Sequence, residues 1–471
     1  MNRRIAIALV LVIVILAYPV AAWVIGLRAE HTWQQREQQI TRRYPFFETT
    51  RHEYHRGVYS STEEVTYRIG GSLANGMRAF SGGAQPPDQQ ITVRNTLHHG
   101  PLPELRAFAP ATVDTQIILP PWIKQKLTEL LGNQATLSIH TRLHWLGGST
   151  TTVQSPAFER KTPDAVAIHW RGLEGTAEVG SELKYYKGAF TAPGLDVKAA
   201  NGNVTLENLQ GTTDQQSSAF EGIYLGTVHM TLARMAIEPT SPAHAISLQN
   251  LALNSKLSAQ GEYVEMAGGV NADSIKFEQL NLTHVGYELR GSHLYGQSLV
   301  TMNKLFQSLQ SDPATPASPE KMQQILKTTG VELLLHDPVL ELPRIGFAMS
   351  EGELLICVKA SAHGFTRDEI DGPASALKAA MAKHLQASAD LRVDTDLLDK
   401  LLDTSGNGDK FTAQLQGLQR QGYLKLDGKA LTTHLTFESG QLQVNGLPFP
   451  PTAPVPGNPM GQPQPPPRGH R

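Results

Sequence analysis

The sequence predicts a mainly β protein of the β-rich α+β class, in which a long curved antiparallel sheet or groove carries a few inserted helices and follows one N-terminal transmembrane helix. Short segments between Tyr44 and Arg290 alternate apolar and polar residues, which is typical of antiparallel sheet with one buried face. The 471 residues include 41 Gly and 30 Pro, and only 18% are charged. That composition favours strands and turns over helical bundles.

The N-terminal apolar run extends from Ile5 to Leu27, contains 23 residues without a charge and follows Arg3 and Arg4. A helix of this length crosses a bilayer core of about 30 Å, and the two arginines place the amino end in the cytoplasm. Val20-Ala21-Ala22 is also a small-residue cleavage site, so residues 1–27 are either a retained anchor or a signal peptide. The apolar run continues past that site, which favours the anchor. Either outcome predicts a bacterial inner-membrane or periplasmic protein with its large domain in the periplasm.

The rest of the chain divides by composition. Residues 28–43 are rich in Gln, Arg and Glu and predict a short juxtamembrane helix. Residues 44–449 form the β-rich periplasmic domain, either undivided or in two lobes that separate near 290–330. Residues 450–471 contain nine prolines, so this tail cannot build a packed core and is predicted to be disordered.

The periodicity of apolar residues and the positions of Pro and Gly predict individual helices and strands. Prolines before and a glycine after the apolar positions predict a helix at Pro120–Gly132. Further helices are predicted at Ser298–Leu309, Ser318–Gly330, Pro373–Ala387 and Asp396–Leu402. Strands are predicted at Glu64–Ile69, Thr136–Leu143, Ala165–Trp170, Val331–Leu335, Val339–Leu342, Leu354–Ala360, Asp390–Val393, Tyr423–Leu426, Leu431–Phe437 and Gln441–Val444.

A weak internal echo occurs in three alternating segments, Val204–Leu209, Ile246–Leu251 and Ile275–Leu280. Each has an amide-bearing residue, Asn or Gln, immediately before its final Leu. The intervals between the segments are unequal, which argues against a solenoid or propeller. Similar strands in one long meandering sheet explain the echo better.

Composition and spacing exclude several functional classes. The net charge is −2, and without a clustered basic face the chain is not expected to bind nucleic acid. The single cysteine, Cys357, cannot form an intrachain disulfide or a cysteine zinc site, and its apolar neighbours predict an inert buried thiol. The closest histidines, His52/His55 and His98/His99, lack metal-site spacing. We find no nucleophile elbow, phosphate loop or dinucleotide fingerprint, so we expect no enzyme, cofactor or metal and assign no catalytic residue.

Three segments are distinctive in other ways. Glu53–Ser61 combines aromatic residues, a cation and a glycine, His99–Pro103 forms a tight turn, and Asp337–Leu342 enters a strand from a turn. The residue preferences of turns and of strand starts also explain each of these segments without a bound ligand. The candidate residues, of unknown role, are Tyr54, His55, Arg56, Gly57, His99, Gly100, Pro101, Asp337 and Pro338.

Together with Gly422–Phe449, these segments resemble the YdgA-like family of uncharacterised bacterial proteins. The matching motifs occur in the same order at Tyr54–Ser61, His99–Pro101, Asp337–Val339 and Gly440–Gly446, whereas the proline-rich tail departs from the family pattern. The resemblance implies an inner-membrane or periplasmic location. It implies no established activity and supplies no catalytic residues.

Two functional hypotheses follow. The first is a membrane-anchored periplasmic protein of cell-envelope maintenance that binds or transfers a lipid or other hydrophobic ligand along a β-groove, by analogy of fold with anchored β-groove proteins. The alternative is an envelope scaffold whose domain binds proteins without a small-molecule ligand. The expected partners are the inner membrane, through residues 5–27, and either a lipid or an envelope protein.

Overall fold

The computed structural model describes residues 21–25, 47–69, 90–132, 137–240, 245–278, 280–311, 330–405 and 408–449. Outside these ranges lie most of the predicted transmembrane helix, the predicted juxtamembrane helix, most of the helix predicted from Ser318, and the tail. Within them, no helix has both the length and the apolar character that a membrane span requires.

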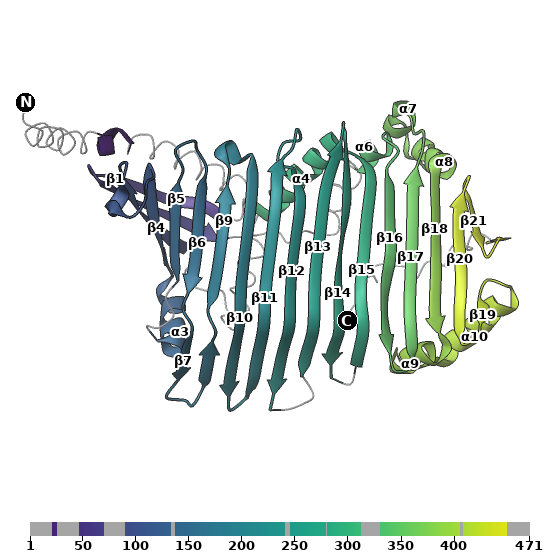
Figure 1. Ribbon diagram of the computed structural model, residues 1–471. Coiled ribbons are helices and arrows are strands. Elements are labelled where there is room, and N and C mark those ends of the chain that lie inside the picture. The colour runs from purple at the N-terminus through teal and green to yellow at the C-terminus, as the bar shows by residue number, and fades with distance from the viewer. Residues whose placement is uncertain are drawn as a thin grey trace, which may run out of the picture.

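The described strands form a single antiparallel sheet of 22 strands (Figure 1), which confirms the predicted mainly β fold with one long antiparallel sheet. The bounds are β1 Phe47–Arg56, β2 Ser60–Ile69, β3 Gln90–His99, β4 Ala111–Ile118, β5 Ser138–Leu143, β6 Ser149–Ser155, β7 Phe158–Lys161, β8 Ala167–Trp170, β9 Leu173–Val179, β10 Tyr185–Ala199, β11 Gly202–Ser217, β12 Tyr224–Pro239, β13 Ile246–Gln260, β14 Tyr263–Phe277, β15 Leu280–Tyr295, β16 Val339–Met349, β17 Gly352–Ala362, β18 Leu385–Asp394, β19 Lys425–Asp427, β20 Ala430–Glu438, β21 Gln441–Val444 and β22 Leu447–Pro448.

Strand pairing follows the order of the chain almost throughout. Each strand from β1 to β6 pairs with the next, β6 pairs with β9, and each strand from β9 to β18 again pairs with the next. β8 lies beside β9 along the same edge of β10 and pairs with β7. β20 pairs with β18 on one side and with β19 and β21 on the other, and β22 pairs with β21.

The helices lie at the ends of the strands. They are α3 Pro121–Leu131, α4 Gly296–Ser311, α6 Val331–Leu334, α7 Arg367–Asp371, α8 Ala374–His384, α9 Thr395–Ser405 and α10 Gly408–Arg420, with short 3₁₀ turns η1 Pro103–Leu105 and η2 Ser181–Leu183. The helices predicted at 120–132, 298–309 and 396–402 are confirmed. The helix predicted at 373–387 ends earlier, at His384, and α10 was not predicted.

The strand predicted at Val331–Leu335 is wrong, because residues 331–334 form helix α6. Val331, Leu334 and Leu335 pack against the buried cluster of Ala362, Phe365, Ile370 and Ala380. Their spacing of three and four positions places them on one face of a helix. That periodicity outweighs the strand-like appearance of a short apolar run.

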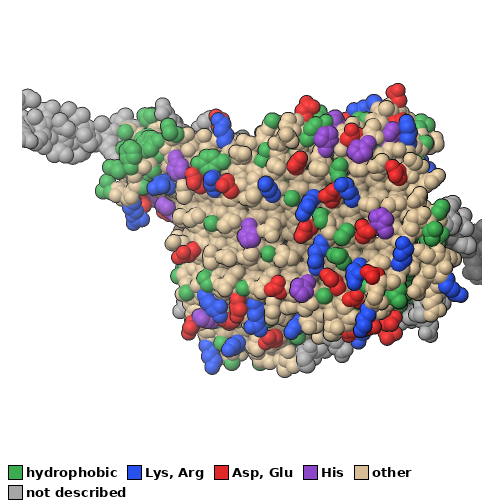
Figure 2. Space-filling view, turned by 45° about the vertical axis from the view of Figure 1, so that its right-hand side comes forward, with side chains coloured by type: hydrophobic (Ala, Val, Ile, Leu, Met, Phe, Trp, Pro, Cys, Tyr) green, Lys and Arg blue, Asp and Glu red, His purple; other side chains and the backbone are tan. Residues whose placement is uncertain are grey.

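The two faces of the long sheet differ in character. One row of directly paired residues across six strands is Phe190, Gly211, Met230, Leu253, Val270 and Tyr287. The next row on that face pairs Ala192, Leu209, Leu232 and Leu251, and further along Ala272 with Val285. The intervening row, whose side chains point to the other face, is Ala189, Thr212, His229, Asn254, Gly269 and Glu288. Figure 2 shows the polar face, with charged and His side chains spread over it. We call the opposite side the apolar face.

A line of left-handed residues crosses the middle of the sheet. Asn208, Asn250 and His284 have φ values of 49°, 51° and 50° on the alternate strands β11, β13 and β15. Asn208 and Asn250 lie at the same level because Leu209 and Leu251 both pair with Leu232. Two of the three echoed amide residues are therefore Asn in the left-handed region, which this residue tolerates better than most. The third, at position 279, lies outside the described residues.

Candidate functional site

The apolar face contains a cavity of about 500 Å³ over β6, β9, β10, β11 and β12. Its lining on this face is mainly apolar and includes Val153, Leu173, Ala177, Phe190, Val228 and Met230. The floor of the cavity includes three glycines, Gly175, Gly188 and Gly211, at positions where any other residue would place a side chain in the cavity. Pockets that bind small hydrophobic molecules have volumes of about 300 to 1,000 Å³ and similar linings.

Phe190 borders the cavity and lies over Gly211. A Cβ atom at Gly211 would lie 2.5 Å from Cε1 of Phe190, so the ring occupies space that only a glycine leaves open. The Phe190 side chain is itself partly exposed. The ring thus forms a side of the cavity rather than filling it. None of these residues was singled out from the sequence, although glycines at alternate positions of neighbouring strands could have indicated a hollow.

The candidate residues from the first two distinctive segments lie together at one corner of the sheet. Tyr54, His55 and Arg56 end β1, Gly57 begins the turn into β2, and His99 ends β3. The turn is closed by a hydrogen bond from Gly57 N to Ser60 O. Gly100, at φ 132°, continues from His99 in a conformation that favours glycine. These residues belong to distinctive segments of the sequence, but the pairing of β1, β2 and β3 is what brings them together at one corner.

Residues 21–25 are helical and pack at this corner. Ala22 is fully buried, and its carbonyl oxygen lies 3.1 Å from Nδ1 of His99. Nε2 of His99 lies 3.1 Å from the Ser61 hydroxyl. Arg56 donates a hydrogen bond of 2.7 Å to the Trp23 carbonyl and places its guanidinium carbon 4.9 Å from the centre of the Trp23 ring. The end of the predicted anchor therefore contacts the motif residues directly.

Burial and charge act together on His99. Burial lowers the pKa of His99 below its usual value of 6.5, and the positive charge of Arg56 lowers this pKa further, whereas the hydrogen bond to Ala22 raises it. The neutral ring matches its neighbours, because Nδ1–H donates to the Ala22 carbonyl and Nε2 accepts from Ser61. This His is arranged to hold a chain segment rather than to exchange protons with a substrate.

A buried polar network lies beside this corner. The fully buried carboxylate of Glu63 lies 3.0 Å from Nε2 of His52 and accepts a hydrogen bond of 2.9 Å from Asn95, whose amide oxygen accepts one from Thr115. The network crosses β1, β2, β3 and β4. No motif in the sequence predicted this network, although Ser61, Glu63 and Val65 alternate on one buried face of β2, which places a carboxylate among buried residues.

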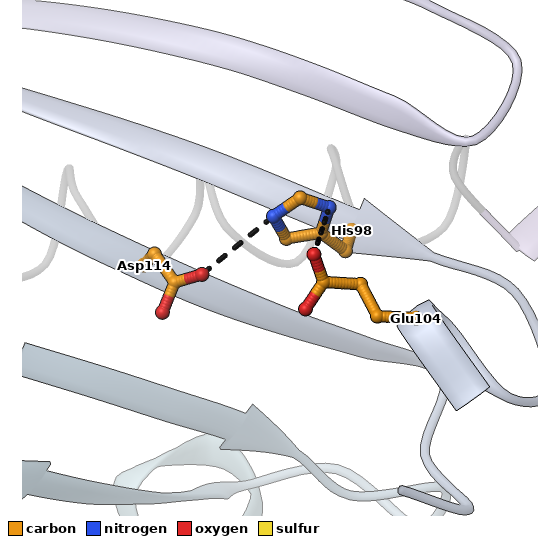
Figure 3. A group of neighbouring side chains, drawn as sticks. All are labelled: His98, Glu104 and Asp114. Carbon is orange, nitrogen blue, oxygen red and sulfur yellow. Dashed lines mark ion pairs between the residues drawn. The ribbon is translucent and has the colours of Figure 1, made fainter. Parts of the chain in front are cut away.

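A second charged group lies on the other side of β3. His98 contacts Glu104 through Nδ1 at 3.5 Å and Asp114 through Nε2 at 3.6 Å, as Figure 3 shows. His140 also contacts Asp114, at 2.9 Å. Ligand atoms of His98, Glu104 and Asp114 lie within 4.8 Å of one another, so these three residues could hold a divalent cation. The two carboxylates face different nitrogens of His98, however, and one ring gives an ion only one nitrogen. An imidazole ring that lies between two carboxylates and contacts each through a different nitrogen accounts for this arrangement better.

Asp337 and Pro338 lie far along the sheet from this corner, between α6 and β16. Asp337, at φ 51°, accepts a hydrogen bond of 2.7 Å from Gly364 N, and the Pro338 carbonyl accepts one from Ala362 N. Both residues thus join the start of β16 to the end of β17 and the residues that follow it. Their contacts are those of strand entry.

A family model described as "Bacterial protein of unknown function (DUF945)" matches residues 1–452. No curated protein and no solved structure matches the chain.

Proposed function

The chain belongs to the bacterial family of unknown function DUF945. Because this family has no assigned activity, we propose a function from the features of the sheet. The protein binds a hydrophobic or amphipathic ligand, such as a lipid, on the apolar face. Its N-terminal segment holds it to the bacterial inner membrane, with the β domain in the periplasm. Within the family we infer a YdgA-like protein, on the four segments named above.

The cavity over Gly175, Gly188 and Gly211 carries this proposal. It is mainly apolar, and one apolar row extends from it along the sheet. In this row Met230, Leu253 and Val270 are half-buried, and Phe190 and Tyr287 at its two ends are exposed. Contiguous exposed apolar surface is uncommon on proteins that bind nothing there. A ligand with an acyl chain or a similar apolar body would cover this surface, so the proposal is binding or transfer rather than catalysis.

Membrane attachment is supported by the corner at β1 and β3. Ala22 belongs both to the uncharged run Ile5–Leu27 and to the buried contact with His99. Signal peptidase acting at Val20-Ala21-Ala22 would cut after Ala22 and remove this residue together with its contact to His99. A domain that binds residues 21–25 is better explained by a segment that stays attached.

The test compares ligands that remain with the full chain after mild extraction from native membranes. Gly175→Val adds bulk to the cavity, and its Cβ fits because the nearest atom, Phe190 Cβ, is 3.4 Å away. Thr191→Val is the matched control, since Thr191 is an exposed residue of β10 whose side chain points to the polar face and does not line the cavity. Organic extraction and mass spectrometry then measure the hydrophobic molecule per protein.

We expect about one ligand per chain in the wild type and in Thr191→Val, and a several-fold loss in Gly175→Val. Empty wild-type protein, or equal occupancy in both variants, would overturn ligand binding in the cavity. Equal circular dichroism spectra of the two variants establish that any loss is local.

The polar face favours the second candidate, an envelope scaffold. A hollow of about 760 Å³ on this face is lined by His229, Asn254, Glu288 and Arg344, a mixture of charges suited to a protein surface. A stoichiometric protein in place of a lipid in the same preparation would support this candidate. Arg344→Glu would then release that protein, whereas Gly175→Val would retain it.

A further inference from the structure

Three loops at one end of the first strands expose large apolar side chains. The β1–β2 turn, the β3–β4 loop and the β5–β6 turn share this end because alternate strands of an antiparallel sheet run in the same direction. Leu146 is 94% exposed, Leu105 83% and Phe108 74%. We call this surface the proximal patch and define it by Val58, Tyr59, Leu105, Phe108, Trp145 and Leu146. Figure 2 shows hydrophobic side chains gathered at the upper left of the polar view.

Contacts between the loops make the patch one surface. His99 N donates a hydrogen bond of 2.9 Å to Tyr59 O, which links the β1–β2 turn to the end of β3. The rings of Phe108 and Trp145 lie 5.4 Å apart, which links the β3–β4 loop to the β5–β6 turn. The patch is therefore continuous across three loops.

The backbone of these loops is in the left-handed region at or beside the exposed apolar residues. Leu105 has φ 60°, a left-handed conformation that costs a residue with a Cβ about 1–2 kcal/mol. Gly147 and Gly148, at φ 86° and 81°, close the turn that presents Trp145 and Leu146. Loop tips are ordinarily built from small polar residues. Apolar tips held outward by a strained backbone indicate a surface that is used.

Residues 21–25 identify what covers the patch. Trp23 is exposed beside it, with its ring on Arg56, and Ala22 is held by His99. These residues lie in the last part of the uncharged run Ile5–Leu27, which is long enough to span a bilayer. Leu, Phe, Trp and Tyr beside Arg are the residues that favour the boundary between lipid headgroups and acyl chains.

We propose that the proximal patch inserts into the interfacial layer of the same membrane that holds the N-terminal segment. The β domain then rests on the bilayer in a fixed orientation instead of moving freely on a tether. This inference rests on the membrane attachment in the proposed function, and it is independent of ligand binding in the cavity.

The test uses the full chain, with Cys357→Ser, in vesicles of phosphatidylethanolamine and phosphatidylglycerol. An environment-sensitive fluorophore is attached at Leu105→Cys or at Leu146→Cys. Leu426→Cys is the matched control, because Leu426 is an exposed apolar residue (56%) in β19, near the other end of the sheet. We expect a blue shift and quenching by brominated acyl chains at 105 and 146, and neither effect at 426.

The outcomes separate the two proposals. If the protein fails to sediment with vesicles, the membrane attachment in the proposed function is wrong and this inference falls with it. If the protein sediments but the labels at 105 and 146 report water, only the inference is overturned. A blue shift that appears without vesicles and grows with protein concentration would assign the patch to a second copy of the chain and also overturn it.

A second measurement does not depend on labels. Leu105→Asp with Leu146→Asp changes two exposed tips, so the fold is expected to remain intact. The variant should still sediment with vesicles but lose the protection of Trp145 from an aqueous quencher. Unchanged protection would contradict insertion of the patch.

Discussion

His99 holds Ala22 across 77 positions of sequence, with its Nδ1 atom 3.1 Å from the Ala22 carbonyl oxygen. A carbonyl oxygen only accepts, so Nδ1 carries the proton and Nε2 of the neutral ring accepts from the Ser61 hydroxyl. Protonation of Nε2 would require Ser61 to reverse its role and would place a second cation near Arg56. The contact between the N-terminal segment and the domain is therefore sensitive to acid.

The first prediction concerns that contact. The pKa of His99 is lowered by burial, so His99 stabilises the packed arrangement above its unperturbed pKa of about 6.5, and this contribution is lost as the pH falls through the lowered pKa. Spin labels at Val24→Cys and Val58→Cys, in a Cys357→Ser background, should give a narrow distance distribution at about pH 8 and a broader one at about pH 5. His99→Gln, which keeps a donor and an acceptor but does not titrate, should remove the pH response. The same broadening in that variant would contradict the assignment.

The second prediction concerns the buried carboxylate of Glu63. Asn95→Ala removes the donor to one of its oxygens and should lower the free energy of unfolding by about 3 kcal/mol, because a buried charge loses a hydrogen bond. Arg94→Ala is the matched control on the same strand, since Arg94 is exposed and pairs with the partly exposed Glu64, an ion pair whose loss costs at most about 1 kcal/mol. Urea unfolding measures both values. Equal losses would argue against the importance of burial at Glu63.

The third prediction concerns the left-handed line. At Asn208, with φ 49°, a β-branched residue is strained, so Asn208→Val should cost about 1 kcal/mol or more, whereas Asn208→Gly should be nearly neutral. Gln210→Val, two residues along β11, should change the free energy of unfolding by less than about 0.5 kcal/mol. The comparison fails if Asn208→Val is as well tolerated as Gln210→Val.

The fourth prediction concerns acid stability at the far corner. Hydrogen bonds from the backbone and hydroxyl of Thr366 and from His384 lower the pKa of Glu369 to about 2. A lowered carboxyl pKa favours the folded state above the unperturbed value of about 4.5, and this contribution disappears as the pH falls towards the lowered value. The stability difference between wild type and Glu369→Gln should therefore be constant near neutral pH and shrink as the pH falls below about 4.5. Thr366→Ser, which keeps the capping hydroxyl, should behave as the wild type.

Sequence periodicity was sufficient for the architecture, because each long strand alternates and pairs with its neighbour. It was insufficient where a short apolar run fitted both the period of a strand and the period of a helix. The apolar run Val331–Leu335 fits a strand by sequence alone. In the structure, however, Leu334 and Leu335 pack on one side of a helix against the cluster that contains Phe365. Helix α10 was missed because Gly408 and the preceding Gly406 and Asn407 suggest a loop.

The candidate residues show a similar limit. Arg56 and His99 were selected as members of distinctive segments, yet nothing local to either indicates that both contact residues 21–25. Phe190 and Gly211 were not selected because their relationship exists only across paired strands. The role of a glycine in one strand can be inferred only when the aromatic ring that lies over it is known.

The order of strand pairing determines how the chain can assemble. From β9 to β18 each strand lies beside the one synthesised just before it, so the sheet can lengthen at a single edge while the chain is still emerging. Until the last strands form, that edge offers unpaired backbone groups to any neighbouring chain. β22 contains only Leu447 and Pro448, and proline cannot donate to a further strand. Chains that stop before β22 would leave the edge of β21 unpaired, so they are expected to aggregate more readily than the full chain.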